Sequence, residues 1–159
     1  MFYRVRQFIK AVTGKVTSEE IAFVKRYLSH EECQLFFRLK PYEQRHCIDV
    51  AYQIMKVLDE DKEMVRLGLL HDIGKIQYPL NPIEKSMIVI LDCISHGKIK
   101  KYATLKMVKC YYLHPQIGYE LLKQIGTYEE EFLEIIRKHH ESHAGDSKLI
   151  LLQKADNLS

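Results

Sequence analysis

Histidine and aspartate side chains lie at the ends of apolar helix faces in this sequence, where they could bind metal ions. The chain has eight histidines among 159 residues. One predicted helix face contains His46, Val50, Ile54 and Val57, so an imidazole stands at the head of an apolar row. Other apolar rows end in the same kind of residue. The residues placed in this way are His46, His71, Asp72, His139, His140 and Asp156.

These residue types favour a metal site over a set of isolated polar groups. A single buried histidine or aspartate is more often hydrogen-bonded to the backbone, but a buried carboxylate is costly unless it is paired or binds a metal. Several such residues on separate helices therefore indicate cations. Imidazole and carboxylate ligands without thiolate suit Mn, Fe, Co, Zn or Mg. The cysteines form no CxxC pair and predict free thiols: Cys33, Cys47, Cys93 and Cys110.

Other polar residues leave two interpretations open. His30, His96 and His143 lie beside glutamates or glycine-containing loops, so we expect them to be exposed rather than ligands. Arg45 could bind a phosphate or lie on the surface. The lysines between Asp72 and His114 could form a positive rim for a polyanionic substrate, or they could lie on a solvated helix face. The tyrosines of the same stretch could stack on a base, or they could pack in the core or at its rim. These residues are Lys98, Lys100, Lys101, Lys106, Lys109, Tyr102, Tyr111 and Tyr112.

The elements that carry these residues are predicted to be helices throughout. Strict alternation and Asn-Gly or Asp-Gly turns do not occur, whereas helix starts recur. Capping boxes are predicted at Thr17–Glu20, Ser29–Glu32 and Thr127–Glu130, further starts at Asn81-Pro82 and Asp146, and a helix end at Gly126. The predicted helices are 3–12, 18–28, 30–39, 42–58, 62–74, 82–95, 101–111, 114–125, 128–141 and 147–157.

Composition favours one globular domain without a membrane or nucleic-acid partner. The chain is 47% hydrophobic and 28% charged, with a net charge of +3, which is far from the balance of a nucleic-acid coat. Charged residues interrupt the N-terminal apolar residues before a signal peptide could form, and no apolar run reaches membrane-span length. The longest run, Met87 to Leu91, predicts a buried helix. We expect a cytoplasmic protein.

The ordered pattern H…HD…D resembles the HD-domain metal-dependent phosphohydrolase superfamily. His46 follows Arg45, His71-Asp72 stand in LLHDIGK, and Asp156 stands in LLQKADNLS. The resemblance covers roughly residues 36–159 and implies an all-α fold, an HD-domain helical bundle, with residues 1–35 as an N-terminal helical extension. By position, it implies that His46, His71, Asp72 and Asp156 bind a first divalent metal, with Asp72 bridging to a second.

Further residues resemble the second metal site of the binuclear branch, which includes the cyclic-dinucleotide phosphodiesterases with an HD-GYP motif. These are His114 in HPQIGYELL and His139-His140 in HHE. Lys75 matches the HDIGK form, in which the lysine lies near the bridging hydroxide and phosphate. The chain departs from that branch because it has no GYP motif, and from trinuclear members because Tyr42 stands where they carry a glutamate. The resemblance implies neither cyclic-di-GMP specificity nor a trinuclear cluster.

The resemblance implies a phosphohydrolase that cleaves a phosphomonoester or phosphodiester, expected to be a small nucleotide. Two metals sharing Asp72 would activate a bridging hydroxide. Lys75, if it points inward, would add a cation beside the phosphate; otherwise it would interact with the dipole at a helix C-terminus. Two alternatives remain open: a mixed-valent di-iron oxygenase on the same scaffold, and a metal-binding regulatory module with little turnover. The substrate, the natural metal, the choice between one and two ions, and the oligomeric state stay undetermined.

Overall fold

The described part of the chain is helical, as predicted. The structure is a computed structural model that describes residues 15–59, 61–142 and 145–159, and these residues contain no strand. The predicted helix at 3–12 lies outside them. The elements are α2 (Ser18–Tyr27), α3 (His30–Phe36), α4 (Pro41–Met55), α5 (Lys62–Leu70), η1 (Ile73–Ile76), α6 (Pro82–Ser95), η2 (Lys98–Tyr102), α7 (Lys106–Ile125), α8 (Glu130–Lys138) and α9 (Ser147–Leu158).

Most predicted helix starts are confirmed by side-chain caps. Thr17 and Ser29 form capping boxes with the glutamates three residues later, and Asn81 forms one at the start of α6. Asp146 caps α9, and Gly126 ends α7 at φ 78°. The predicted box at Thr127 is wrong, because α8 begins after Glu129 and no side chain caps it.

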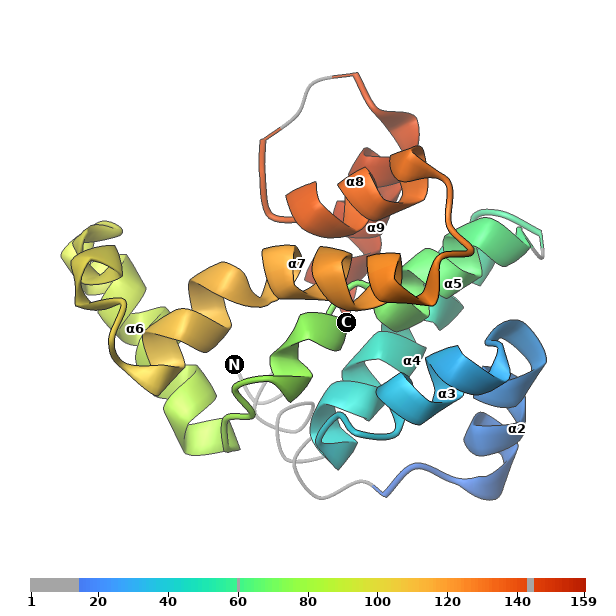
Figure 1. Cartoon of the computed structure of the whole chain (residues 1–159), viewed down its shortest axis with the longest axis horizontal. Coiled ribbons are helices and arrows are strands. Elements are labelled where there is room, and N and C mark those ends of the chain that lie inside the picture. Colours follow the sequence, from blue (N-terminus) through green and yellow to red (C-terminus); the bar gives the residue numbers. More distant parts are fainter. Residues whose placement is uncertain (1–14, 60, 143–144) are drawn as a thin grey trace.

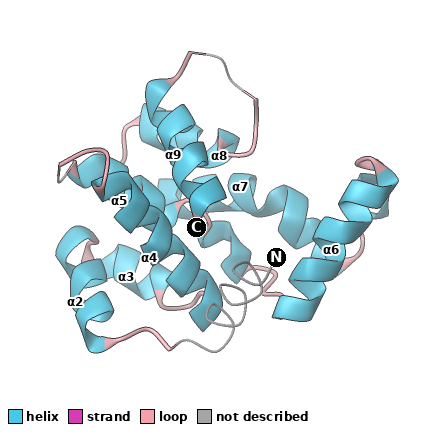
Figure 2. Ribbon diagram, turned by 180° about the vertical axis from the view of Figure 1, so that it is seen from behind, coloured by secondary structure: helices cyan, strands magenta, loops and turns pink. Residues whose placement is uncertain are grey.

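One hydrophobic core joins the helices that carry the predicted ligands. Helix α4 packs against α5 and α9, while α7 packs against η1 and α8 (Figures 1 and 2). Val24 of α2 and Phe36 of α3 belong to the same core as Ile54, Leu69 and Leu152. Helices α2 and α3 therefore pack on the bundle that holds the site.

Two predicted helix boundaries are wrong. The helices predicted at 101–111 and 114–125 are one helix, α7, which continues through Pro115. Proline removes one backbone hydrogen bond, but contacts with η1 and α8 hold this half of the helix in place. The helix predicted at 62–74 instead ends at Leu70. His71 and Asp72 form a turn, and the chain continues as the short helix η1.

Helix α6 contradicts the prediction that its apolar run is buried. Ile88 is the only buried residue of α6, whereas Met87, Val89 and Ile90 are exposed. The helix packs with η2 and α7 around a second, smaller core, away from α2–α5 (Figure 1). Val57, expected on a buried stripe, is also exposed. Among the described helices, none is long and apolar enough to cross a membrane.

Candidate metal centre

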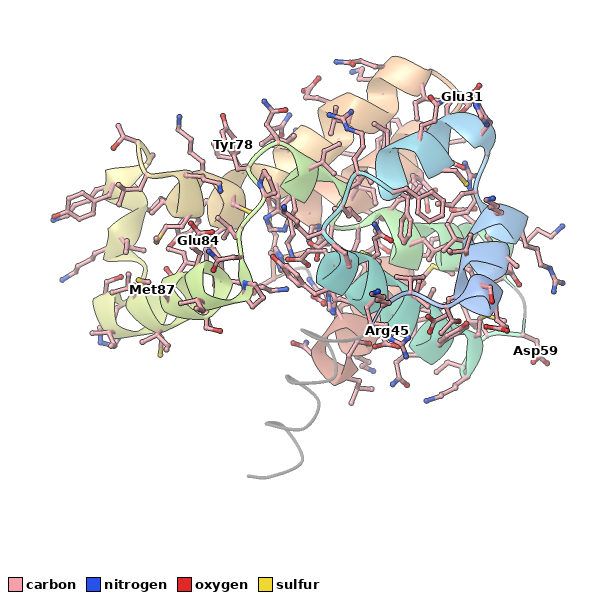
Figure 3. The ribbon with its side chains drawn as sticks, turned by 90° about the horizontal axis from the view of Figure 1, so that it is seen from below. Glu31, Arg45, Asp59, Tyr78, Glu84 and Met87 are labelled. Carbon is pink, nitrogen blue, oxygen red and sulfur yellow. The ribbon has the colours of Figure 1, made fainter. Side chains whose placement is uncertain are left out.

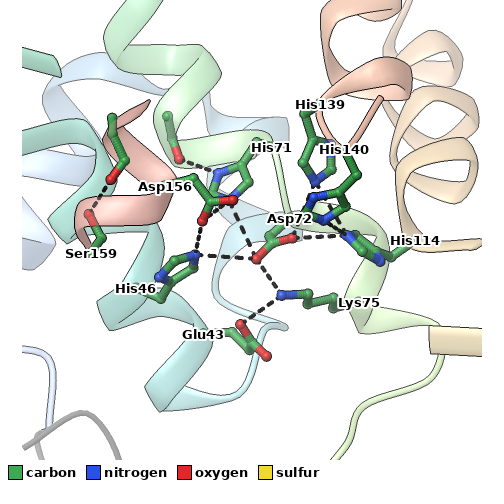
Figure 4. A network of polar contacts seen from close by, with 12 residues as sticks. Glu43, His46, His71, Asp72, Lys75, His114, His139, His140, Asp156 and Ser159 are labelled. Carbon is green, nitrogen blue, oxygen red and sulfur yellow. Dashed lines mark hydrogen bonds and ion pairs between the residues drawn. The ribbon is translucent and has the colours of Figure 1, made fainter. Parts of the chain in front are cut away.

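Two helices, α4 and α9, and the turn after α5 bring the first group of predicted ligands together. His46 of α4 meets His71 and Asp72, and one ligand atom from each lies within 4.8 Å of the others. Asp156 of α9 completes the group, because its Oδ1 lies 2.9 Å from Nε2 of His46 and 3.8 Å from Nε2 of His71. Figure 4 shows these side chains pointing toward one another.

A second group of predicted ligands shares Asp72. His114 of α7, together with His139 and His140 at the end of α8, places one ligand atom each within 4.8 Å of the others and of Asp72. His114 and His139 are buried, and His140 is exposed at the edge of the group. Every ligand predicted from the sequence therefore lies in one of two adjoining groups (Figure 4).

The two carboxylate oxygens of Asp72 face different groups. Its Oδ2 lies 3.4 Å from Nε2 of His71 and 3.7 Å from Nε2 of His46. Its Oδ1 lies 3.2 Å from Nε2 of His114 and 3.7 Å from Nε2 of His139. This is the arrangement that a carboxylate needs to bridge two cations.

Backbone carbonyls fix the orientation of three imidazole rings. Nδ1 of His71 donates to the Gly68 carbonyl at 2.8 Å, and Nδ1 of His114 donates to the Cys110 carbonyl at 2.7 Å. Nδ1 of His139 donates to the carbonyl of Ile136, also at 2.7 Å. A carbonyl only accepts, so a proton lies on Nδ1, and in the neutral ring the lone pair lies on Nε2. Such outer contacts are typical of metal-bound histidines.

The electrostatics of the second group favour a cation. Burial lowers the pKa of His114 to about 4, and burial with the neighbouring imidazoles lowers the pKa of His140 to about 3. Both rings are therefore neutral at pH 7. Nε2 of His114 nevertheless lies 3.3 Å from Nε2 of His139 and 3.2 Å from Nε2 of His140. In His114 and His139 the lone pairs face each other, a repulsive contact that a shared cation would convert into two ligand bonds.

Two buried atoms in the described residues support the same conclusion. Nε2 of His71 and Oδ1 of Asp72 are buried and have no hydrogen-bond partner. Polar atoms left without a partner in a dry interior are costly. Burial also opposes ionisation of Asp72, yet Lys75 and His71 hold the pKa of its carboxyl well below its usual range. A buried anion that faces several imidazole nitrogens fits divalent metal ions.

Lys75 points into the centre from η1. Its ammonium contacts Oδ2 of Asp72 and lies 3.2 Å from Oε2 of Glu43. Burial would lower the pKa of Lys75, but the two carboxylates raise it well above its usual value. Lys75 is thus a fixed cation beside the ligand that both groups share.

Glu43 is a residue of this site that the sequence analysis missed. It is buried, and its carboxylate also accepts from Nζ of Lys85 at 3.1 Å. It heads a buried row of α4 with Cys47, Val50 and Ile54. A charged residue at the head of an apolar row was the signal used for the histidines, and it would also have found Glu43.

Comparison with known proteins identifies the family of this chain. A model of the HD-domain family matches residues 44–159, which is more than half of the chain. The chain belongs to the HD-domain family. HD domains are all-helical and are in general metal-dependent phosphohydrolases. The searches of curated proteins and of solved structures found no match.

Other polar residues of this HD domain lie away from the centre. The Arg45 guanidinium contacts the buried Glu20 and lies 3.5 Å from Asp49, so it pairs with carboxylates of α2 and α4. The Tyr42 hydroxyl donates to the Leu80 carbonyl at 2.7 Å. His30 and His96 are exposed, as expected, and His143 lies outside the described residues.

A cavity of about 810 Å³ opens beside His140. It therefore adjoins the second group of ligands. Its wall contains cations, carboxylates and two aromatic rings from α6, η2, α7 and α8. The lining residues are Asp92, Lys100, Tyr111, Tyr112, Pro115, Gln116, Arg137, Lys138, His140 and Glu141.

Gly74 allows η1 to lie against α7, and replacing it should destabilise this HD domain. A Cβ at position 74 would lie 2.6 Å from the Gly118 nitrogen and 2.8 Å from the His114 carbonyl carbon. Because backbone cannot yield as a side chain does, we expect Gly74→Ala to lower the free energy of unfolding by about 3 kcal/mol or more in urea denaturation. Gln77→Ala, at an exposed position next to η1, is the control. A loss below about 1 kcal/mol for Gly74→Ala would contradict the close approach.

Proposed function

We propose that this HD domain is a binuclear metal-dependent phosphohydrolase. The observation that carries the proposal is Asp72, whose two oxygens face two separate groups of ligands. His46, His71, Asp72 and Asp156 would hold one divalent ion, and Asp72, His114, His139 and His140 would hold the other. Mn, Fe, Co, Zn and Mg all accept such imidazole and carboxylate ligands.

The residues of the chain would bind and orient the phosphate. Two divalent ions, when bound, supply an activated water and offset charge on the phosphoryl oxygens. Lys75 adds a fixed ammonium at the same place, where it can donate to a phosphate oxygen. Glu43 positions Lys75 through its 3.2 Å contact, and Lys85 in turn neutralises Glu43.

The cavity beside His140 supports a nucleotide substrate. A phosphate at the centre would leave its organic part in this cavity, where the rings of Tyr111 and Tyr112 could contact a base. The Lys100 ammonium lies 5.6 Å from the Tyr112 ring centroid and, within the described residues, contacts no carboxylate. A free cation and an aromatic wall suit a nucleoside phosphate.

Replacing Lys100 should weaken binding of a nucleotide but not of a small phosphate ester. We expect Lys100→Ala to raise KM for nucleoside monophosphates about tenfold, the size of one charge-assisted hydrogen bond, with little change in kcat. KM for p-nitrophenyl phosphate, which is too small to span the cavity, should stay unchanged. Lys101→Ala is the matched control, since Lys101 is exposed and lies over Tyr102 outside the cavity lining. Equal effects of the two variants would contradict the assignment.

Hydrolysis without oxygen tests the proposed function. The metal-free protein is loaded with Mn under anaerobic conditions and assayed with bis(p-nitrophenyl) phosphate, p-nitrophenyl phosphate and nucleoside monophosphates. Metal-dependent release of phosphate or nitrophenol is expected. Turnover that needs iron and dioxygen would instead indicate the oxygenase, and two bound metals without turnover on any ester would indicate a regulatory module.

The free thiols are consistent with the expected cytoplasmic location.

A further inference from the structure

The outer face of α6 carries an apolar row that nothing in the described chain covers. Ile83, Met87, Ile90 and Ile94 are 73%, 43%, 57% and 71% exposed. Their spacing of four, three and four residues places them on one face of the helix. We call these four residues the α6 seam. Leu91, also exposed, borders it.

Contacts within the described chain hold α6 weakly. Ile88 is its only buried residue. Polar contacts also hold it: Lys85 pairs with Glu43, and Asp92 accepts hydrogen bonds from Tyr111 and Tyr112. A helix of this length is marginal in water unless an apolar face is packed. Since the apolar side of α6 faces outward, the helix lacks the packing that would normally stabilise it. Figure 3 labels Met87 of the seam on α6, which projects from the other described helices.

The residues around the seam favour a helix as its partner. The 4-3-4 spacing is that of helices that pack side by side, with each side chain entering a gap on the facing helix. The seam contains no charge, so two identical seams meet without repulsion. Helix α6 has two carboxylates, Glu84 and Asp92, and one ammonium, Lys85. It therefore lacks the excess of Lys and Arg that helices lying on anionic membranes carry.

We propose that a second copy of this chain covers the α6 seam and forms a two-fold dimer through paired α6 helices. In such a contact the same face of both copies is buried. The two exposed apolar faces together bury on the order of 1,000 Å², the lower end for a specific protein interface. Because the inner side of α6 carries Asp92 and Lys85, the dimer would also steady the wall of the cavity and the Glu43–Lys75 pair. The proposal does not depend on the proposed function.

Sedimentation velocity of the full, metal-loaded chain tests the dimer over micromolar to hundred-micromolar concentrations. We expect twice the chain mass for the unmodified protein. Ile90→Glu should shift the equilibrium to the monomer and raise the dissociation constant at least about 30-fold, as for an interface hot spot. Val89→Glu is the matched control, because Val89 is the next residue, is also exposed and lies on another side of α6. It should leave the dimer intact. Far-UV circular dichroism checks that both variants fold.

Several results would overturn the dimer. One is a monomer at the highest concentration, and another is a dimer that Ile90→Glu leaves unchanged. A monomer whose α6 amides exchange slowly, and whose protection is lost in the full-length variant Phe8→Glu, would show that residues 1–14 cover the seam. A monomer that sediments with phosphatidylglycerol vesicles, and no longer does so as Ile90→Glu, would show a lipid surface.

Discussion

Asp72→Ala should abolish metal-dependent hydrolysis and remove metal from both groups of ligands. The substitution takes away the anion that both groups share, whereas loss of any histidine leaves one group complete. We expect kcat/KM to fall at least about 1,000-fold, because the lost interaction is worth several kcal/mol and each 1.36 kcal/mol corresponds to a factor of ten. Steady-state kinetics with p-nitrophenyl phosphate and metal content measure both effects.

The control for Asp72 is another aspartate on the same bundle. Asp49→Ala removes a half-buried carboxylate of α4 that lies beside Arg45 and belongs to neither group of ligands. It should keep the metal content and at least about half of the activity, as is usual for substitutions away from a site. Full activity in Asp72→Ala, with unchanged metal content, would show that Asp72 does not bridge.

Removal of metal should lower the melting temperature strongly. The second group holds imidazole lone pairs against one another, and the first holds Nε2 of His71 without a hydrogen-bond partner in the described chain. Ions that bind only the folded state remove these costs. At a free metal concentration about 1,000 times Kd, the gain is about 4 kcal/mol. For a chain of this size we expect the melting temperature to fall on the order of 10 °C with chelator, measured by calorimetry.

The Asp72→Ala variant provides the control for the chelator experiment. Chelator should not change the melting temperature of Asp72→Ala, because that protein would hold no metal in either group of ligands. An unmodified protein that loses its metal to chelator, yet keeps its melting temperature, would mean that the two groups are stable without ions.

Local chemistry made much of this fold predictable from the sequence. The hydroxyl and carboxylate at Thr17 and Glu20 are three residues apart, so their capping box depends only on nearby atoms. The apolar rows that end in His46, His139 and Asp156 depend on helix periodicity alone. The residue types predicted a metal site, but the assignment of each residue to one of two metal ions came only from the family resemblance, because distances between helices far apart in the sequence are set by tertiary packing.

Where the predictions were wrong, tertiary contacts outweighed local preference. A break between residues 111 and 114 was predicted, but α7 is continuous and is held by contacts with η1 and α8. The apolar run from Met87 to Leu91 suggested burial, yet α6 turns this face outward. Local pattern cannot tell a face that packs within the chain from a face that packs on another molecule. The role of Glu43 could not be predicted from the sequence, since it depends on contacts with Lys75 and Lys85, which lie far away in the sequence.

Metal content per chain tests the central claim most directly. The protein is purified anaerobically without added metal, and metals are counted against protein concentration by inductively coupled plasma mass spectrometry. The account predicts close to two transition metal ions per chain, and close to one in His114→Ala, which loses a ligand of the second group only. Close to one ion in the unmodified protein, unchanged in His114→Ala, would contradict a binuclear centre and leave His46, His71, Asp72 and Asp156 as a single site.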